Sequence, residues 1–198
     1  MTLPVRYSPS GAPITNGGGA ILGFGPGARL RLTETQVVMA GSQAVPASPD
    51  VISPDGFGDP DAVVLSLSAP KEQLQYRAKL SLDVLNTSTN ASAQVVLYLD
   101  TSVDDGVTYT NRAKSVHIIG ADVVPQEARN IDVYLPLILG TSLGVDDSVP
   151  TSNIKIRARA NAPVGTLAFV SSLATSGGGG GAVANCNGTI HMELEECF

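Results

Sequence analysis

The sequence contains no tryptophan, only two cysteines and two histidines, and few charged side chains. Charged residues make up 15% of the chain, against about 25% in ordinary soluble domains. Aromatic residues make up 5%, which disfavours stacking against sugars, while 21 glycines and 13 prolines are present. This composition suits either a surface that neighbouring subunits largely cover or a chain with a high content of loops.

Long apolar runs are also missing. No stretch approaches the 18 or more apolar residues of a membrane helix. Residues 1–6 show no basic stretch followed by an apolar run, so nothing resembles a signal peptide. The net charge of −6 and the pI near 4.7 argue against broad contact with nucleic acid phosphates. We therefore expect a soluble protein made in a cytoplasm, with no nucleic acid partner and no membrane partner.

The two cysteines, Cys186 and Cys197, lie at the end of the chain. A disulfide between them would close a small C-terminal loop, but a reducing cytoplasm favours free thiols. His191 lies between them, yet three ligands at this spacing do not match a known zinc motif. We expect no metal site here.

The residues that an enzyme needs are scarce. His117 and His191 both fall within candidate strands and are expected to face outward. A nucleophile elbow of the G-x-S-x-G type is absent, and the glycine run at 177–181 lacks the lysine of a phosphate-binding loop. We therefore expect a protein that is not an enzyme and has no catalytic residues and no cofactor.

Strict alternation of apolar and polar residues is the main pattern in the chain. It is clearest at 76–84, where Arg77, Lys79, Ser81 and Asp83 alternate with apolar residues. A two-residue period places one strand face in a core and the other in water. Repeated between turn residues, it predicts an all-β, antiparallel β-sandwich with a jelly-roll-like fold of about eight strands. The candidate strands are 30–39, 62–69, 76–87, 92–100, 107–119, 129–139, 153–160, 164–171 and 188–197.

Residues 1–28 are rich in proline and glycine and cannot form a regular core element. We expect an extended N-terminal arm at 1–28 and a single β-sandwich domain at 29–198. The arm is either disordered or becomes ordered against a partner. For the second case we expect Ile21, Leu22 and Phe24 to be the residues that bind the partner.

Two further features concern the surface. The segment 40–61 is long for a loop in a compact domain, which indicates either a functional loop or one that lies on a neighbouring subunit. Basic residues also recur on the outward faces of three candidate strands. Adjacent strands would join them into a basic stripe that pairs with Glu193, Glu195 and Glu196 of another subunit, whereas the plainer interpretation is an ordinary solvated sheet face. The basic residues are Arg29, Arg31, Arg77, Lys79, Lys155, Arg157 and Arg159.

The sharpest local motif spans residues 100–109. It resembles the Asp-box of sialidases and other β proteins, in which an Asp side chain and a Gly backbone close a hairpin tip above an aromatic residue. One copy in a chain too short for a propeller implies a turn rather than glycosidase activity. Asp100, Asp104 and Asp105 lack the EF-hand spacing and are expected to be solvated turn carboxylates, with a bridging calcium ion as the alternative. The motif residues are Ser102, Asp104, Gly106, Thr108 and Tyr109.

Taken together, the low charge, small-residue-rich strands, N-terminal arm and hairpin resemble viral structural proteins. The pattern is similar to the β-sandwich or jelly-roll cement, decoration and minor capsid proteins of tailed bacteriophages and large dsDNA viruses. The resemblance implies a virion protein, assembled in the host cytoplasm, that stabilises a capsid as a homo-oligomer, with a trimer favoured. Its partners would be the major capsid protein or other virion proteins. The alternative is a receptor- or glycan-binding spike or fibre head, with 40–61 and 101–108 as the site.

Overall fold

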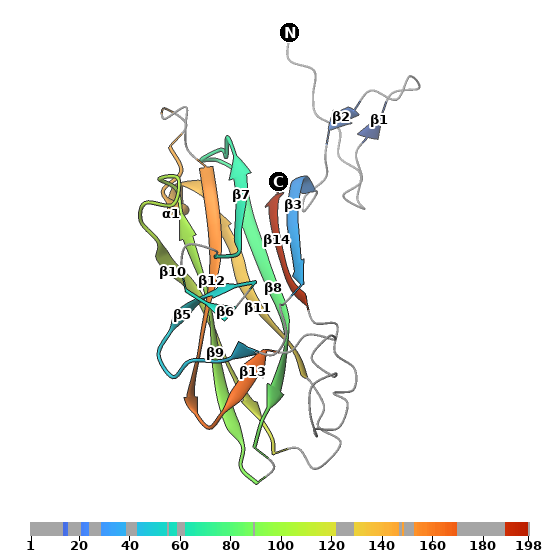
Figure 1. Ribbon diagram of the computed structural model, residues 1–198. Coiled ribbons are helices and arrows are strands. Elements are labelled where there is room, and N and C mark those ends of the chain that lie inside the picture. The colour runs from blue at the N-terminus through green and yellow to red at the C-terminus, as the bar shows by residue number, and fades with distance from the viewer. Residues whose placement is uncertain are drawn as a thin grey trace.

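The computed structural model shows an all-β protein in which two antiparallel sheets form a sandwich (Figure 1). This confirms the fold class predicted from the alternation of apolar and polar residues. The structure describes residues 14–15, 21–23, 29–38, 43–54, 56–58, 62–88, 90–121, 129–146, 148, 153–169 and 189–197.

The first sheet, called sheet I, has the long strand β8 near its centre. β8 pairs along one edge with β11 and along the other with β14, and β14 pairs with β3. The short strands β13 and β4 continue the β14 side along the C-terminal end of β8. The bounds are β3 Arg29–Val38, β4 Gln43–Ala44, β8 Gln75–Asn86, β11 Arg129–Leu139, β13 Leu167–Phe169 and β14 Thr189–Cys197.

The second sheet, called sheet II, has β9 and β12 at its centre. β10 pairs with β9 and forms one edge, while β7 and β5 pair with successive parts of β12 on the other side. β6 continues the sheet beyond β5. The bounds are β5 Asp50–Ser53, β6 Gly56–Phe57, β7 Val64–Ser68, β9 Ala93–Ser102, β10 Thr110–Ile119 and β12 Asn153–Val164.

Four strand pairs define the topology. β3 pairs with β14, β7 with β12, β8 with β11, and β9 with β10. Each pair encloses the next along the chain, so these eight strands form one long antiparallel ribbon that is folded over into two sheets. The resulting orders, β3-β14-β8-β11 and β7-β12-β9-β10, are those of a jelly roll. The hairpin between β9 and β10 is the innermost turn of this ribbon.

The two-residue period of the strands builds the core between the sheets. In β8 the side chains of Tyr76, Ala78, Leu80 and Leu82 are buried, whereas the intervening residues lie on the outer face. β14 repeats the pattern with Ile190, Met192 and Leu194 inward, as predicted from the sequence. Full burial of each large aliphatic side chain contributes about 1.5–3 kcal/mol relative to exposure. The buried residues of both sheets form one continuous cluster.

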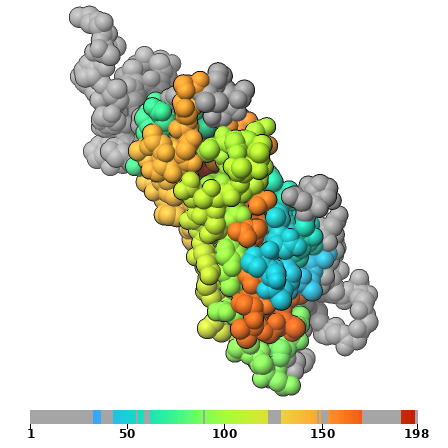
Figure 2. All heavy atoms as spheres, turned by 90° about the vertical axis from the view of Figure 1, so that its left-hand side faces the viewer, coloured from blue at the N-terminus to red at the C-terminus, as the bar shows by residue number. Residues whose placement is uncertain are grey.

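The segment 40–61 differs from its sequence-based interpretation. Its described residues include the short strands β4, β5 and β6, and Val45, Val51 and Ile52 are buried in the core. β5 pairs with β12, so the described part of this segment belongs to its own sandwich. Figure 2 shows it in blue and cyan against the side of the molecule. Strands of two to four residues are too short to show a period in the sequence, which is why the pattern missed them.

Outside the sandwich sheets, β1 (Ile14–Thr15) and β2 (Ile21–Gly23) form a separate two-stranded antiparallel sheet. Ile21 and Leu22 of the expected arm lie in β2, and Phe24 lies outside the described residues. No helix in the described part of the chain is long and apolar enough to cross a membrane.

A single helical turn, α1 (Gly140–Leu143), follows β11. A Cβ atom at Gly140 would lie 2.3 Å from the carbonyl oxygen of Lys71, so the close approach of the two backbones requires glycine there. The Gly140 N–H donates to the carbonyl of Leu74 at 2.8 Å. This contact ties the end of β11 to the turn that precedes β8.

Candidate functional site

The hairpin between β9 and β10 carries the Asp-box-like residues. The Ser102 hydroxyl donates to Asp104 Oδ1 at 2.6 Å and accepts the Gly106 N–H at 2.9 Å. Asp104 accepts the Thr108 N–H at 2.9 Å and the Thr108 hydroxyl at 2.5 Å. The oxygens of Asp104 therefore bond within the turn, and the arrangement closes a hairpin.

The electrostatics of this turn agree with that geometry. Hydrogen bonds from Ser102 and Thr108 lower the pKa of Asp104 from 3.8 to about 2, because they stabilise the ionised carboxylate. Asp105 and Gly106 take positive φ values of 60° and 91°. Lys155 of β12 donates to the Asp105 carbonyl at 2.8 Å, which attaches the tip to the neighbouring strand.

The outer face of sheet II continues from this tip as rows of facing residues. One row places Asn111, Asp100 and Arg157 side by side on β10, β9 and β12. The next row holds Lys114, Tyr98 and Arg159 in the same strand order. The register of the ladder thus places three cations, one tyrosine, one amide and one carboxylate next to one another on the sheet.

Asp100 is the centre of this arrangement. Its side chain is 2% exposed and receives both the Nε of Arg159 at 2.5 Å and the Nη2 at 3.0 Å. Asn111 Nδ2 donates at 3.0 Å and Arg157 Nε at 3.4 Å. Burial raises the pKa of Asp100, but the hydrogen bonds from Arg159 and Asn111 outweigh it, and the pKa lies below its ordinary value. Asp100 is therefore a buried strand carboxylate held by arginines, and the expectation that it is a solvated turn carboxylate is wrong.

Cations also cover the tyrosines of the outer faces. Arg157 lies 3.9 Å from the ring centre of Tyr109, while Arg159 and Lys114 lie 5.0 and 5.8 Å from that of Tyr98. These are cation–π distances. In sheet I, Lys79 lies 5.7 Å from the ring centre of Tyr134.

The basic stripe considered from the sequence does not form. Lys155, Arg157 and Arg159 lie on β12 of sheet II, whereas the other four basic positions lie on β8 and β3 of sheet I. Within sheet I, β14 separates β3 from β8 and places its glutamates between them. Which strands become neighbours in a sheet depends on the topology of the whole chain. The alternation of residues within one strand does not reveal it.

The basic residues of β8 pair within the chain. Arg77 forms an ion pair with Glu195, and Lys79 Nζ lies 3.3 Å from Asp132 Oδ2. Glu195 is therefore engaged inside this subunit rather than held for another one. Beside these pairs lies a depression of about 270 Å³, lined by Arg77, Ala78, Lys79, Tyr134, Leu135, Glu193 and Glu195.

His117, on the edge strand β10, was expected to face outward, and this prediction is wrong. His117 faces the buried Val95 across the ladder, so it lies on the inner side at the edge of the sandwich, half-buried, with Nε2 2.7 Å from the Ser115 hydroxyl. Its neighbours Val116 and Ile118 point outward instead and are 49% and 75% exposed. The run at 116–119 is apolar apart from His117. Because apolar residues occupy both faces of the strand there, the sequence does not show which side chains face the core.

An apolar surface results at the end of sheet II away from the hairpin tip. Ile118 and Val164 both lie opposite Gln94, on β10 and β12, and Val116 lies opposite Val96. Val164 is 56% exposed. We call Val116, Ile118 and Val164 the sheet II apolar patch.

Comparison with known proteins finds no matching family model and no matching curated protein. Among solved structures, the chain is similar to those of infectious bursal disease virus, Gx strain (12% identity, TM-score 0.30) and Gt strain (13%, TM-score 0.30). These likenesses cover 100% and 99% of this chain but 46% of each viral chain, so this chain spans less than half their length.

A third similar structure is the family 11 carbohydrate-binding module from Clostridium thermocellum in complex with a β-1,3-1,4-mixed-linked tetrasaccharide. Its identity is 13% and its TM-score 0.21, and the likeness covers 72% of this chain and 86% of the module. Likenesses this loose assign neither an activity nor a partner to the chain.

Proposed function

We propose that this chain is a non-enzymatic structural virion protein that stabilises a viral capsid through contacts between subunits. The observation that carries the proposal is the nested pairing of eight strands into a jelly roll. Viral capsid proteins and lectin domains are two major users of this architecture. A fold alone does not assign a function. Features of the surface are therefore needed to distinguish a capsid protein from a lectin.

The tyrosines favour the structural role over glycan binding. Tyr98, Tyr109 and Tyr134 lie on the outer faces of the described sheets, and each has a cationic group over its ring. A ring face that stacks on a guanidinium or an ammonium group is not presented to a sugar on that side. The charged residues beside Tyr98 and Tyr134 form ion pairs with carboxylates of the same chain.

The sheet II apolar patch supplies a surface for contacts between subunits. β10 is an edge strand of sheet II, and its outer side chains are presented to a neighbour. Val116, Ile118 and Val164 would become buried when a second copy docks there. Association along a lattice then adds weak contacts into a strong overall attachment.

The N-terminal arm is the second contact in this proposal. Residues 1–28 would bind a neighbouring subunit or the major capsid protein, with Ile21, Leu22 and Phe24 as the anchoring side chains. Pairing of an arm with an exposed sheet edge supplies backbone hydrogen bonds and covers the edge. The expected assembly is a homotrimer located in the virion.

Light scattering of the purified full chain at several concentrations tests the proposal. We expect a stable trimer, and we expect deletion of residues 1–28 to reduce both trimer formation and binding to capsid particles. Replacing Ile21, Leu22 and Phe24 by serine should reproduce the deletion. If the deleted chain keeps both its oligomeric state and its binding to particles, the arm has no role in assembly.

A pair of lysine substitutions tests the apolar patch. Ile118→Lys should weaken subunit association because the introduced ammonium would have to be buried in the contact. Val107→Lys is the matched control, since Val107 is 81% exposed at the hairpin tip, outside the patch. Equal association of both variants contradicts a contact at β10. Binding to a glycan array without binding to particles would instead favour the receptor- or glycan-binding head.

A further inference from the structure

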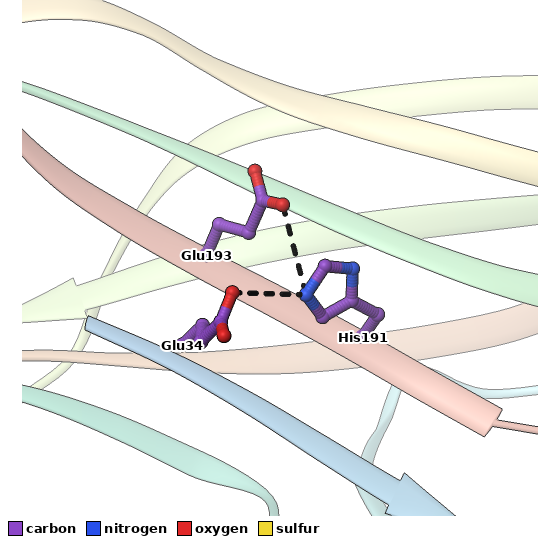
Figure 3. A group of neighbouring side chains, drawn as sticks. All are labelled: Glu34, His191 and Glu193. Atoms are coloured by element: carbon purple, nitrogen blue, oxygen red, sulfur yellow. Dashed lines mark ion pairs between the residues drawn. The ribbon is translucent and has the colours of Figure 1, made fainter. Parts of the chain in front are cut away.

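Three side chains with metal-binding atoms converge on the outer face of sheet I, where β3 and β14 pair (Figure 3). His191 Nε2 lies 3.7 Å from Glu34 Oε2 and 3.6 Å from Glu193 Oε1. One atom from each of the three residues lies within 4.8 Å of the other two. The two carboxylates thus approach the same ring nitrogen, as the dashed lines in Figure 3 show.

The strand register produces this cluster. Glu34 of β3 lies directly opposite Glu193 of β14. His191 precedes Glu193 by two positions and therefore projects from the same face of the strand. Gln36 of β3 lies opposite His191 and is exposed. Adjacent strands therefore hold the imidazole and the carboxylates in a defined relative position.

The facing glutamates are an unfavourable pair by themselves. Like charges directly opposite each other in an antiparallel ladder are destabilising. Lys79 on β8 lies opposite Glu193 and offsets part of this charge, but its ammonium lies 3.3 Å from Asp132 and over the ring of Tyr134, on the β11 side. The arrangement thus gathers negative charge beside an imidazole, where a bound cation would relieve the repulsion.

We propose that Glu34, His191 and Glu193 bind one divalent transition-metal ion of the zinc type. Imidazole nitrogen and carboxylate oxygen are ordinary ligands of Zn²⁺ at about 2.0–2.2 Å, whereas Ca²⁺ and Mg²⁺ are bound by oxygen ligands. Two such ligands of a tetrahedral ion lie about 3.3 Å apart, by geometry from these bond lengths. The observed 3.6 and 3.7 Å exceed this by a few tenths of an ångström. The two carboxylate oxygens lie within 4.8 Å of each other, and rotation of the exposed Glu34 side chain would bring them closer.

The site is open to an ion from solvent. The side chains of His191 and Glu193 are each 33% exposed, and that of Glu34 is 63% exposed, so it is able to close over an ion. Three protein ligands leave a fourth position, which water or the neighbouring Gln36 amide oxygen fills. The inference rests on this cluster alone and holds whether or not the chain is a capsid subunit.

Calorimetric titration of the chelator-treated full chain with ZnCl₂ tests the proposal. We expect one ion per chain and a rise in melting temperature that EDTA reverses, because an ion bound only by the folded state stabilises it. Substitution His191→Ala should weaken zinc binding roughly tenfold or more, since even indirect partners of a metal cost a site about 10- to 100-fold. Glu34→Gln should weaken binding as well.

Two controls separate this site from other zinc ligands. His117→Ala should leave the affinity unchanged, because His117 is the other histidine and lies on β10 of sheet II. The double variant Cys186→Ser, Cys197→Ser should also retain binding, and the Co²⁺ form should lack the near-ultraviolet charge-transfer absorption of cobalt thiolates.

The proposal is overturned if the wild-type chain takes up no zinc at several-fold excess, or if His191→Ala binds as tightly as wild type. Loss of binding in the cysteine variant would place the ion at the thiols and would likewise overturn it. Equal competition by Ca²⁺ would contradict the assigned donor set.

Discussion

On the outer face of sheet II, one carboxylate, Asp100, is surrounded by two arginines and an amide. On the outer face of sheet I, the carboxylates of Glu34 and Glu193 face each other beside one imidazole. The first arrangement matches charge within the chain and is nearly closed to solvent at its centre. The second brings two carboxylates together at a partly exposed edge, where Lys79 opposite Glu193 offsets only part of their charge. A carboxylate that is paired with arginines contributes to the stability of the fold. Two neighbouring carboxylates instead provide ligands and negative charge for a bound cation.

The largest effect on stability is expected at Asp100. Asp100→Ala should lower the free energy of unfolding by about 3 kcal/mol, because it leaves two arginines without their shared buried partner. Urea unfolding of the variant and the wild type measures the difference. Asp105→Asn is the control, since that carboxylate is 64% exposed and asparagine also accepts the positive φ of this position, so its unfolding midpoint should stay near wild type. Equal effects of both variants would show that burial of Asp100 is not what matters.

A smaller effect is expected at the hairpin tip of sheet II. Ser102→Ala removes a hydroxyl that bonds both Asp104 and the Gly106 N–H and should cost about 1–2 kcal/mol. Chemical denaturation measures the loss. Ser66→Ala, at an exposed serine of β7, should unfold like wild type. A comparable loss at Ser66 would contradict a specific role for the tip.

The contribution of the hairpin tip to stability should also depend on pH, through Asp104. The pKa of Asp104 is lowered from 3.8 to about 2 in the folded chain, so its carboxylate favours folding above about pH 4. This contribution is lost as the pH falls from about 4 toward 2, where the folded protein also takes up the proton. The stability difference between wild type and Asp104→Asn should therefore shrink over that window. A difference that stays constant down to pH 2 would contradict the turn hydrogen bonds as its cause.

The smallest effect on stability is expected at the facing glutamates of sheet I. In the presence of EDTA, Glu34→Gln should stabilise the chain by about 0.3 kcal/mol, because it removes one of two facing like charges. With zinc added, the order should reverse, since the variant loses a metal ligand. Thermal melting under both conditions measures this reversal. A variant less stable than wild type in both conditions would show that Glu34 acts only as an ion-pair partner.

The strands of the sandwich could be predicted because their period is local. Eight candidate strands coincide closely with β3, β7, β8, β9, β10, β11, β12 and β14. Where the period failed, a physical reason is visible. β5 has only four residues and β6 two, and the outer face of β10 is as apolar as its inner face at Val116 and Ile118. In both places the contrast between a wet and a dry face is missing.

The outer-face sites could be predicted only in part, because their members come from distant strands. The bonds of Ser102, Asp104 and Gly106 span four residues of chain or fewer, so turn chemistry was enough to single these residues out. His191 and Glu193 could be placed on one face of a strand. That Glu34 joins them, and that Arg77 faces Glu195 within the same chain, depends on β14 inserting between β3 and β8.

The sequence by itself determined that this chain is an all-β sandwich and which side chains of most strands face the core, because a two-residue period is a property of each strand alone. Only the tertiary structure decided which strands are neighbours, how the basic residues divide between the sheets, and where like charges meet. The reason is that hydrogen bonds between strands are the same for any sequence, so partner and register follow from the packing of the whole core.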